Sequence, residues 1–273
     1  MTATTATIPV TESLPIESRS RFGWAVSDAL AVAGRNLRAM QRVPEVIVFS
    51  TIQPILFVLM FRYAFGGAIN TGPIPYVDYL MPGIFAQIVA FGAVNTGIGL
   101  AEDLQKGLIE RFRSLPMARS AVLAGRTLAD LVRNALVIAL MVVMGFLVGF
   151  RLHTNVAAFL FAVVLLLLFA FALAWVMATI GLAMPSSEAA QAAAFPPLAL
   201  LTFASSAFVP LQTQPGWLQA FSAHQPLTIT VDAVRALVLG GPTLTHVVQS
   251  VAWSLAIVVV FAPIAVARYR KAA

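Results

Sequence analysis

Six long apolar runs constrain the fold of this chain more than any other feature of its sequence. They occupy Val46–Ala64, Leu80–Ala101, Leu131–Phe150, Val156–Met184, Ala190–Val209 and Val247–Ala267. A helix needs about 20 mostly apolar residues to cross the hydrocarbon core of a bilayer, and each run is close to that length. We therefore predict an all-α integral membrane protein whose residues 44–273 form one domain of six transmembrane helices.

The composition agrees with a membrane protein and excludes several other classes. Hydrophobic residues make up 60% of the 273 residues and charged residues only 10%, whereas a soluble domain has about 25% charged residues. The absence of cysteine excludes disulfides and thiolate metal sites. The three histidines are too scattered to predict a metal site or a catalytic pair. The formal net charge of +6 lies in short loops beside apolar runs, so it indicates membrane topology rather than nucleic-acid binding.

The basic residues predict the orientation of the chain. If both termini are cytoplasmic, 14 of the 17 Lys and Arg residues lie inside, and Arg62, Arg151 and Arg235 lie outside. Cytoplasmic loops carry an excess of Lys and Arg, so this arrangement is favoured. Because abundant Arg and Ala indicate a GC-rich bacterial source, we expect a multi-pass protein of the bacterial cytoplasmic membrane with both termini in the cytoplasm.

Two regions precede the first apolar run. Residues 1–20 are rich in Thr, Ser, Pro and Glu and predict a disordered cytoplasmic tail. Residues 21–43 place apolar and basic side chains on opposite helix faces, which predicts an interfacial amphipathic helix on the membrane lipids. The alternative is a solvated lead-in to the first span. The residues expected to anchor the interfacial helix are Trp24, Arg35, Arg38 and Arg42.

The second and third apolar runs contain polar and small residues. Gly92, Gly97 and Gly99 occur among Gln, Asn and Thr side chains, a composition that suits close helix packing or, alternatively, a path through the protein. Asp130 and Arg133 are spaced i, i+3 at the inner end of the third run. This spacing predicts a local ion pair at the membrane interface.

Residues 102–119 form the most substantial loop expected on the inner side. Leu104, Leu108, Phe112 and Leu115 recur at helical spacing, and charged residues form a second stripe before Pro116 ends the pattern. The pattern predicts a short amphipathic helix. Such a helix inserts its apolar face into a groove of a cytoplasmic partner, or alternatively rests at the membrane surface without one.

Residues 211–246 are expected outside and are too interrupted to span the bilayer. Two short helices broken at Gln225-Pro226 fit this segment, with Asp232 and Arg235 as an i, i+3 ion pair. The segment is either a re-entrant hairpin dipping into the outer leaflet or a surface cap. The predicted apolar stripe of the second short helix contains Leu227, Val231, Val234 and Val238.

Two motifs resemble those of one membrane protein family. ERFRSLPM at residues 110–117, followed by Gly125-Arg126, is similar to the conserved loop of ABC transporter type 2 permeases. FVP at 208–210, PGWL at 215–218 and HQPL at 224–227 resemble the last outer loop of the daunorubicin-resistance branch. The likeness in motif order and length extends from about Trp24 to Arg270.

The resemblance implies a division of labour between chains. Permeases of this family bind two copies of a separate cytoplasmic ABC ATPase, which binds ATP and Mg²⁺, and they pair with a second permease chain, identical or paralogous. The sequence agrees in one respect, because it has no G-x-x-x-x-G-K-[ST] phosphate-binding loop. We thus expect no cofactor in this chain and no enzyme activity of its own.

The resemblance also assigns expected roles to residues. The loop at 102–119 would couple the ATPase to the membrane domain, and the outer segment would form a re-entrant gate. Expected coupling residues are Glu102, Lys106, Leu108, Glu110, Arg111, Phe112, Arg113, Leu115 and Pro116. Expected gate residues are Pro215, Trp217, Pro226, Asp232 and Arg235.

The expected function is export of hydrophobic or amphiphilic drugs, antibiotics or lipids. A rival with the same fold exports a polysaccharide or glycolipid. A lipid-modifying membrane enzyme is a further alternative, but the sequence shows no paired acids, Ser/His pair or metal ligands near one membrane surface. A passive channel is disfavoured because the spans lack a ring of polar or charged residues.

Overall fold

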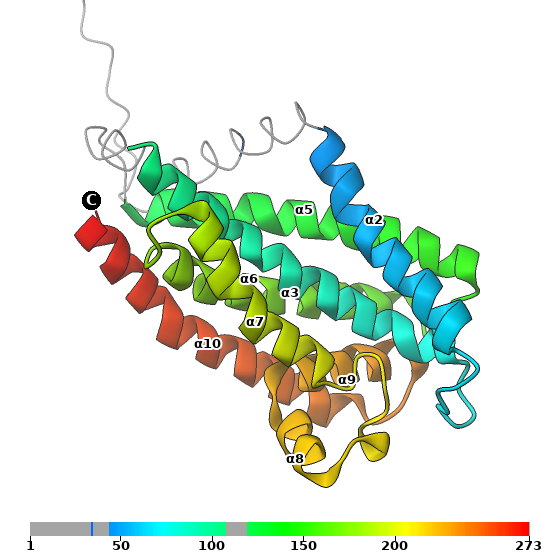
Figure 1. Cartoon of the computed structure of the whole chain (residues 1–273). Helices are drawn as coiled ribbons and strands as arrows, with labels where there is room; N and C mark the ends of the chain where they lie inside the picture. Colours follow the sequence, from blue (N-terminus) through cyan, green and yellow to red (C-terminus); the bar gives the residue numbers. More distant parts are fainter. Residues whose placement is uncertain (1–33, 35–43, 108–118, 273) are drawn as a thin grey trace, which may run out of the picture.

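The computed structural model describes residues 34, 44–107 and 119–272, and these residues form helices and connections without strands. Figure 1 shows the helices side by side in one elongated bundle. In chain order they are α2 (Pro44–Met60), the π-helical turn η1 (Phe61–Phe65), α3 (Tyr76–Gln105), α5 (Arg119–Val148), α6 (Val156–Gly181), α7 (Ser187–Phe203), the 3₁₀ turn η2 (Leu211–Thr213), α8 (Gly216–His224), α9 (Pro226–Leu239) and α10 (Thr243–Ala272).

Four of these helices are long and apolar enough to cross a membrane, namely α3, α5, α6 and α10. The predicted all-α fold is therefore confirmed for the described residues, and four of the six predicted spans have the required length. The other two predicted spans correspond to α2 with η1 and to α7, which has 17 residues. That these two segments cross the membrane remains a prediction.

Local sequence signals set several helix ends. The Asn155 side chain accepts a hydrogen bond from the Ala158 amide at the start of α6, and Ser186 caps the start of α7 through the Ala189 amide. Gly240 follows α9 with φ +93°, a conformation that suits glycine after a helix. These caps explain why the observed and predicted starts of the α6 and α7 segments differ by at most three residues.

The prediction for the third span was wrong at its start. Hydropathy placed that start at Leu131, but α5 already begins at Arg119. The preceding residues include Arg119, Arg126 and Asp130, which lower the local hydropathy, yet they continue the helix. Arg126 pairs with Asp103 of α3 at 2.5 Å, and this contact ties the polar end of α5 to its neighbour.

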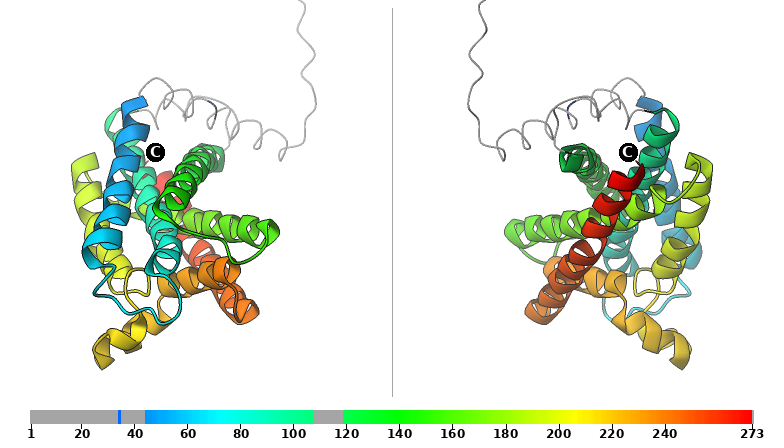
Figure 2. Two further views of the ribbon diagram at one scale, coloured as in Figure 1. Left: turned by 90° about the vertical axis from the view of Figure 1, so that its right-hand side faces the viewer. Right: turned by 90° about the vertical axis from the view of Figure 1, so that its left-hand side faces the viewer.

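α3 lies at the centre of the bundle. It packs against α6 on one side and against α5, α7 and α9 around it, and most of its residues are buried. Figure 2 shows the surrounding helices from both sides, with α8 projecting at one end. α10 packs mainly on α6 and α9 and leaves a broad apolar face exposed, as expected of a helix that borders lipid.

Glycines allow the closest helix approaches, as the packing interpretation of the second run predicted. A Cβ on Gly97 would meet the backbone carbonyl of Met177, and one on Gly181 would meet the carbonyl of Gly97. α3 and α6 therefore cross with their backbones almost in contact, an arrangement that small residues permit.

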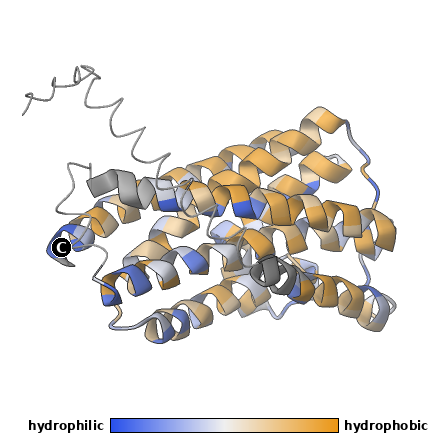
Figure 3. Cartoon of the chain, turned by 90° about the horizontal axis from the view of Figure 1, so that it is seen from above, coloured by the Kyte–Doolittle hydropathy of each residue, from blue (hydrophilic) through white to orange (hydrophobic). Residues whose placement is uncertain are grey.

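The charges gather at the two ends of the bundle. The ends of α3 and α10 and the start of α5 lie together near the C-terminus in Figure 1, and they carry Lys106, Arg126, Arg268, Arg270 and Lys271. In Figure 3 the helices are hydrophobic along most of their length and more hydrophilic towards this end. The residues predicted to lie inside, where the structure describes them, thus share one end, apart from Arg133 in the middle of α5.

Candidate functional site

Most of the predicted coupling and interfacial residues lie outside the described part of the chain. This applies to Trp24, Arg35, Arg38 and Arg42 of the predicted interfacial helix and to the predicted tail at 1–20. It also applies to Leu108, Glu110, Arg111, Phe112, Arg113, Leu115 and Pro116. Their predicted roles stay predictions.

The two coupling residues that are described, Glu102 and Lys106, lie at the end of α3. The prediction that a separate amphipathic helix runs from Glu102 to Met117 was wrong at its start, because α3 continues to Gln105. Lys106 pairs with Glu102 at 3.3 Å one turn earlier, which favours the extra turn. Gly107, with φ +63°, then takes the chain out of the helix.

Several contacts join the end of α3 to the first half of α5 and to the connection between α6 and α7. The Arg126 guanidinium, which pairs with Asp103, also packs against Gly99, where a side chain would displace it. Gln105 donates a hydrogen bond to the Pro185 carbonyl at 3.3 Å, which joins the end of α3 to the connection between α6 and α7. This end of the bundle is therefore held together on both sides of the predicted coupling loop.

Glu188 lies at the same end, in the first turn of α7. Its carboxylate accepts hydrogen bonds from its own backbone N–H and from Ser186. The carboxylate thus stabilises the start of a helix, where a negative charge is favourable.

At the opposite end, the outer segment forms the two short helices that the sequence predicted. α8 ends at His224, and α9 begins at Pro226, whose ring suits the first helical position. Pro215 precedes α8, and Trp217 on α8 is 76% exposed. The segment is shorter than predicted, because α10 already begins at Thr243.

α9 is buried, whereas α8 is not. The predicted apolar stripe of α9, from Leu227 to Val238, has no exposed surface, and α9 packs on α3, α6 and α10. Thr154 also donates a hydrogen bond to the Leu237 carbonyl at 2.6 Å. α9 is therefore part of the bundle core, and the re-entrant and surface-cap interpretations both stay predictions.

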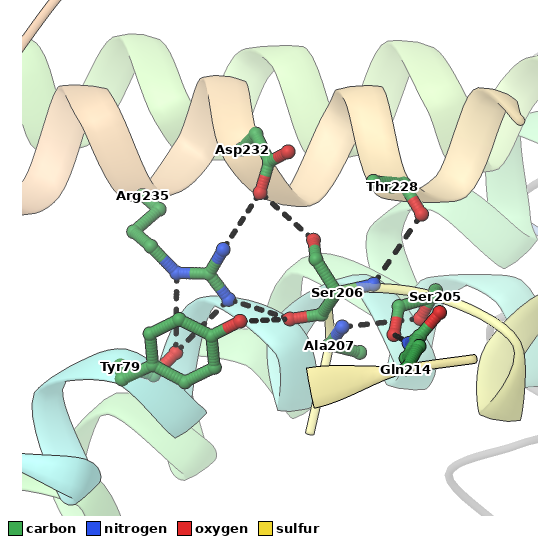
Figure 4. Close-up of polar contacts among 8 residues, drawn as sticks. All are labelled: Tyr79, Ser205, Ser206, Ala207, Gln214, Thr228, Asp232 and Arg235. Atoms are coloured by element: carbon green, nitrogen blue, oxygen red, sulfur yellow. Dashed lines mark hydrogen bonds and ion pairs between the residues drawn. The ribbon is translucent and has the colours of Figure 1, made fainter. Parts of the chain in front are cut away.

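The predicted ion pair between Asp232 and Arg235 forms, and it belongs to a larger network (Figure 4). Arg235 donates from Nη1 to Asp232 at 2.7 Å and from Nη2 to the carbonyls of Ser206 at 2.8 Å and Tyr79 at 3.2 Å. Its guanidinium also lies over the Tyr79 ring, 3.7 Å from the centroid. A single arginine thus joins α9, the start of α3 and the connection after α7.

Ser206 completes the network from the third segment. Its hydroxyl donates to Asp232 at 2.8 Å, its carbonyl accepts from the Tyr79 hydroxyl at 2.9 Å, and its amide donates to Thr228 at 3.3 Å. The sequence analysis did not identify Ser206 or Tyr79, because neither belongs to a charged pair or a motif. The available signal was the polar pair Ser205-Ser206 inside the fifth apolar run.

A second ion pair lies deeper in the bundle. Arg133 contacts Asp130 at 3.3 Å, as predicted, and Arg133 also donates to the Gly92 carbonyl of α3 at 2.7 Å. Thr96 donates to the other oxygen of Asp130. The pair lies in the first half of the candidate span Gly125–Val148, and its predicted position at the membrane interface stays a prediction. Ionisable groups within an apolar helix are costly unless they are paired, as these two are.

Together these features describe a membrane bundle with three polar regions and no cluster of three metal-ligating side chains among the described residues. Basic helix ends lie together at one end of the bundle. The buried short helix α9 lies at the other end, where Arg235 links it to α3. Between the two ends, Arg133 of α5 donates a hydrogen bond to Gly92 of α3. Because α3 and α5 run between the two ends and contact each other, a displacement of these helices at one end can move the other end.

Comparison with known proteins agrees with this architecture. Residues 28–239 match the ABC-2 type transporter family. The chain is 33% identical over 247 residues to the daunorubicin resistance ABC transporter permease protein DrrB1 of Streptomyces coeruleorubidus, covering 90% of this chain and 87% of that one.

Two further relatives extend the comparison. The probable doxorubicin resistance ABC transporter permease protein DrrC of Mycobacterium tuberculosis is 28% identical over 90% of each chain. The putative transport permease ycf38 of Cyanophora paradoxa is 23% identical over 78% of this chain and 74% of its own length. Since the family match covers most of the chain and one relative exceeds 30% identity over nearly all of it, the chain belongs to the ABC-2 type transporter family, as a membrane permease related to antibiotic resistance permeases.

Proposed function

We propose that this protein is the membrane-spanning subunit of an ATP-driven exporter that moves hydrophobic or amphiphilic compounds out of the cell. The observation that carries this proposal is the family match across residues 28–239, together with near full-length similarity to permeases named for daunorubicin and doxorubicin resistance. A separate ABC ATPase supplies the energy and binds ATP with Mg²⁺, since this sequence contains no phosphate-binding loop.

In this proposal, α2 with η1 and α7 are the two additional spans. Residues 44–65 are helical throughout, which matches the length of about 20 residues that a bilayer core requires. α7, with 17 residues, lies at the lower end of the range of about 17–25 residues. Six spans place both termini on the same side, and the excess of basic residues favours the cytoplasmic side.

The end of the bundle with the basic helix termini is proposed to receive the ATPase. A ligand or partner shifts a conformational equilibrium only through different affinities for its two states. Residues 102–119 lead from the end of α3 into the start of α5. A partner that binds this loop therefore acts directly on both helices. Phe112 and Leu115 are the proposed apolar anchors, and Glu110, Arg111 and Arg113 fix the register by charge complementarity.

The opposite end is proposed to control release of the substrate. α9 is too short to span the bilayer and is buried, so it suits a re-entrant segment whose backbone is shielded by protein. Arg235 ties α9 to α3 and to the connection after α7. Movement of α3 therefore has a direct mechanical route to the outer segment.

We propose two permease chains and two ATPases in the assembly.

The test combines purification with transport. The tagged permease is isolated from its native membranes in mild detergent, and we expect a soluble P-loop ATPase in equal amount. Inside-out vesicles with both subunits should accumulate doxorubicin only with ATP and Mg²⁺. Phe112→Ala and Glu110→Ala should insert normally but lose the ATPase and the transport.

Leu244→Ala is the matched control, because Leu244 is an apolar residue, 77% exposed, at the opposite end of the bundle. It should retain both partner and transport. Unchanged transport in both loop variants would remove the proposed coupling role. ATP-independent accumulation with no ATPase partner would contradict the exporter function itself and favour a channel.

A further inference from the structure

Three polar contacts join α3 to α5 within the candidate membrane spans. From the end with the basic helix termini inward, they are Asp103 with Arg126 at 2.5 Å, Thr96 with Asp130, and Gly92 with Arg133 at 2.7 Å. The α5 residues are spaced i, i+4 and i+7, and their α3 partners also share one helix face. The contacts therefore form a continuous line along both helices, which we call the polar seam.

The charges of the seam are compensated within it. Asp103 neutralises Arg126, and Asp130 neutralises Arg133 at 3.3 Å. None of these four side chains is more than 20% exposed. A largely buried ion that loses its partner is strongly destabilising. The seam is therefore favourable only while its residues keep these partners.

Sliding α5 along α3 would break the contacts between the two helices. A slip of one turn is about 5.4 Å, which is more than a hydrogen bond can stretch. In one direction the slip would move Arg126 from Asp103 towards Lys106, a like charge. In the other direction it would move Arg126 towards Gly99 and leave Asp103 unpaired. The charges of the seam thus favour one register and oppose a slip either way.

Glycines of α3 let the α5 side chains lie directly on its backbone. A Cβ added to Gly99 would overlap the Arg126 guanidinium, and one added to Gly92 would overlap the side-chain amide of Asn134. Close packing of this kind holds side chains in one arrangement, because neighbouring atoms fill the space around them. The seam is therefore held by packing as well as by charge.

The packing is looser where α2 meets the two helices. A cavity of about 140 Å³ lies between α2, α3 and α5, and its lining includes Gln53 and Pro54 of α2, Gln87 of α3 and Arg133 of α5. Atoms that line a void lack partners on one side and lose part of their van der Waals attraction. Relative movement is therefore easier to accommodate between α2 and the other two helices than across the seam.

We propose that the polar seam makes α3 and α5 one rigid unit, which moves during the transport cycle without sliding of one helix along the other. This inference rests on the proposed export function. Residues 102–119 connect the two helices at the end proposed to receive the ATPase. A pull on this loop would otherwise be lost as a slip between the helices, and the seam prevents that loss.

The charged residues of the seam therefore act as positioning residues for coupling. The Asp103–Arg126 pair holds the two helices together next to the loop, and Asp130 holds them together deeper in the bundle through Thr96. α3 extends to the opposite end, where the Tyr79 carbonyl accepts a hydrogen bond from Arg235. A displacement of the unit thus reaches that end without loss to sliding.

The first test measures the coupling ratio, which is the number of doxorubicin molecules transported per ATP hydrolysed, in proteoliposomes that contain the permease and its ATPase subunit. Arg126→Gln should lower this ratio about fivefold or more while ATP hydrolysis continues, since coupling free energies are typically of that size. The double variant Asp103→Arg with Arg126→Asp restores the ion pair in reverse and should recover most of the ratio. A merely structural pair would change the yield of folded protein but not the ratio.

Arg268→Gln is the matched control, because it makes the same chemical change at an exposed position near the end of α10. It should transport doxorubicin and hydrolyse ATP like the wild type. Equal coupling ratios in Arg126→Gln and Arg268→Gln would overturn the proposal.

A second test uses the absence of cysteine from the chain. A Cβ on Gly92 would lie 2.2 Å from Oδ1 of Asn134, so Gly92→Cys with Asn134→Cys brings two thiols within reach of a disulfide. The double variant leaves the seam intact, since Gly92 contributes only its carbonyl. The rate of cross-linking should be the same without nucleotide, with ATP, and with ADP and vanadate. The cross-linked protein should keep the coupling ratio of its reduced form.

Transport that is lost on cross-linking and regained on reduction would show that α3 and α5 must slide, and would overturn the proposal. A cross-linking rate that changes with nucleotide would overturn it as well. The coupling ratio keeps the proposal testable if the cysteine variant fails to fold, and cross-linking does so if Arg126→Gln fails to fold. ATP-independent accumulation with no ATPase partner would contradict the exporter function, whereas ATP-driven transport that cross-linking abolishes would contradict this inference alone.

Discussion

The arginines at positions 235 and 133 sit in two buried polar clusters that differ in how completely they are satisfied. Arg235 makes hydrogen bonds to Asp232, Ser206 and Tyr79 and stacks on an aromatic ring. Arg133 contacts Asp130 and Gly92 but borders a cavity with an unpartnered Gln87 carbonyl. Both clusters connect α3 to another segment.

This difference predicts that the two clusters contribute differently to stability. Where every polar group has a protein partner, the cluster rigidifies the segments that it joins. Where a buried acceptor is left without a partner, as at Gln87, the unmade hydrogen bond costs free energy. Substitution of the arginine should therefore cost more stability in the first cluster than in the second.

The largest effect is expected from Arg235→Leu. Removing this guanidinium leaves Asp232 without its ion-pair partner and frees the carbonyls of Tyr79 and Ser206. Breaking a buried pair on one side costs about 3–5 kcal/mol, measured as the free energy of unfolding in denaturant in lipid-detergent micelles. Arg268→Ala, at an exposed position of α10, should change it by less than about 0.5 kcal/mol. Equal effects of the two would refute the structural role of Arg235.

Arg133→Leu should destabilise the protein less. The substitution removes hydrogen bonds to a charged partner, worth about 1.5–3 kcal/mol, but the adjoining cavity lets water reach the groups left behind. The same measurement of the free energy of unfolding shows which of the two arginine substitutions costs more stability. A larger loss for Arg133→Leu than for Arg235→Leu would reverse the distinction between the clusters.

A pair of glycine substitutions on α3 tests the packing next to the second cluster. An added methyl on Gly97 would meet the backbone carbonyl of Met177, which cannot move without shifting α6. One on Gly92 would meet the side-chain amide of Asn134, which can rotate towards the cavity. Both variants gain the same helix propensity, so Gly97→Ala should be less stable than Gly92→Ala by about 1–2 kcal/mol. Equal unfolding free energies would show that the α3–α6 crossing is not tight.

Much of the helical framework follows from local sequence. The bilayer requires long apolar helices, so hydropathy alone finds α3, α6 and α10, and Pro226 with the preceding Gln225 predicts the break between α8 and α9. The Asp232–Arg235 pair is also local, since its two residues lie one turn apart. For the same reason the ends of helices that leave the apolar layer, such as the start of α5 at Arg119, were missed.

The contacts that make these residues a site depend on distant segments. Tyr79 and Arg235 are far apart in sequence, and only the packing of α9 against α3 brings them together. The cavity likewise needs three helices, and none of them shows it alone. The wide spacing of Gln87 and Arg133 gives no periodic signal, so sequence predicts the presence of polar residues in the spans but not their convergence.

The smallest effect on stability, and the sharpest contrast, is expected from Gln87→Leu. The Oε1 atom already lacks a hydrogen-bond partner among the described residues, so an apolar side chain of similar volume removes a desolvation cost rather than a bond. The free energy of unfolding should stay the same or rise by about 0–1 kcal/mol. A clear loss of stability would mean that Gln87 serves the fold as Arg235 does, and the two clusters would then have the same role.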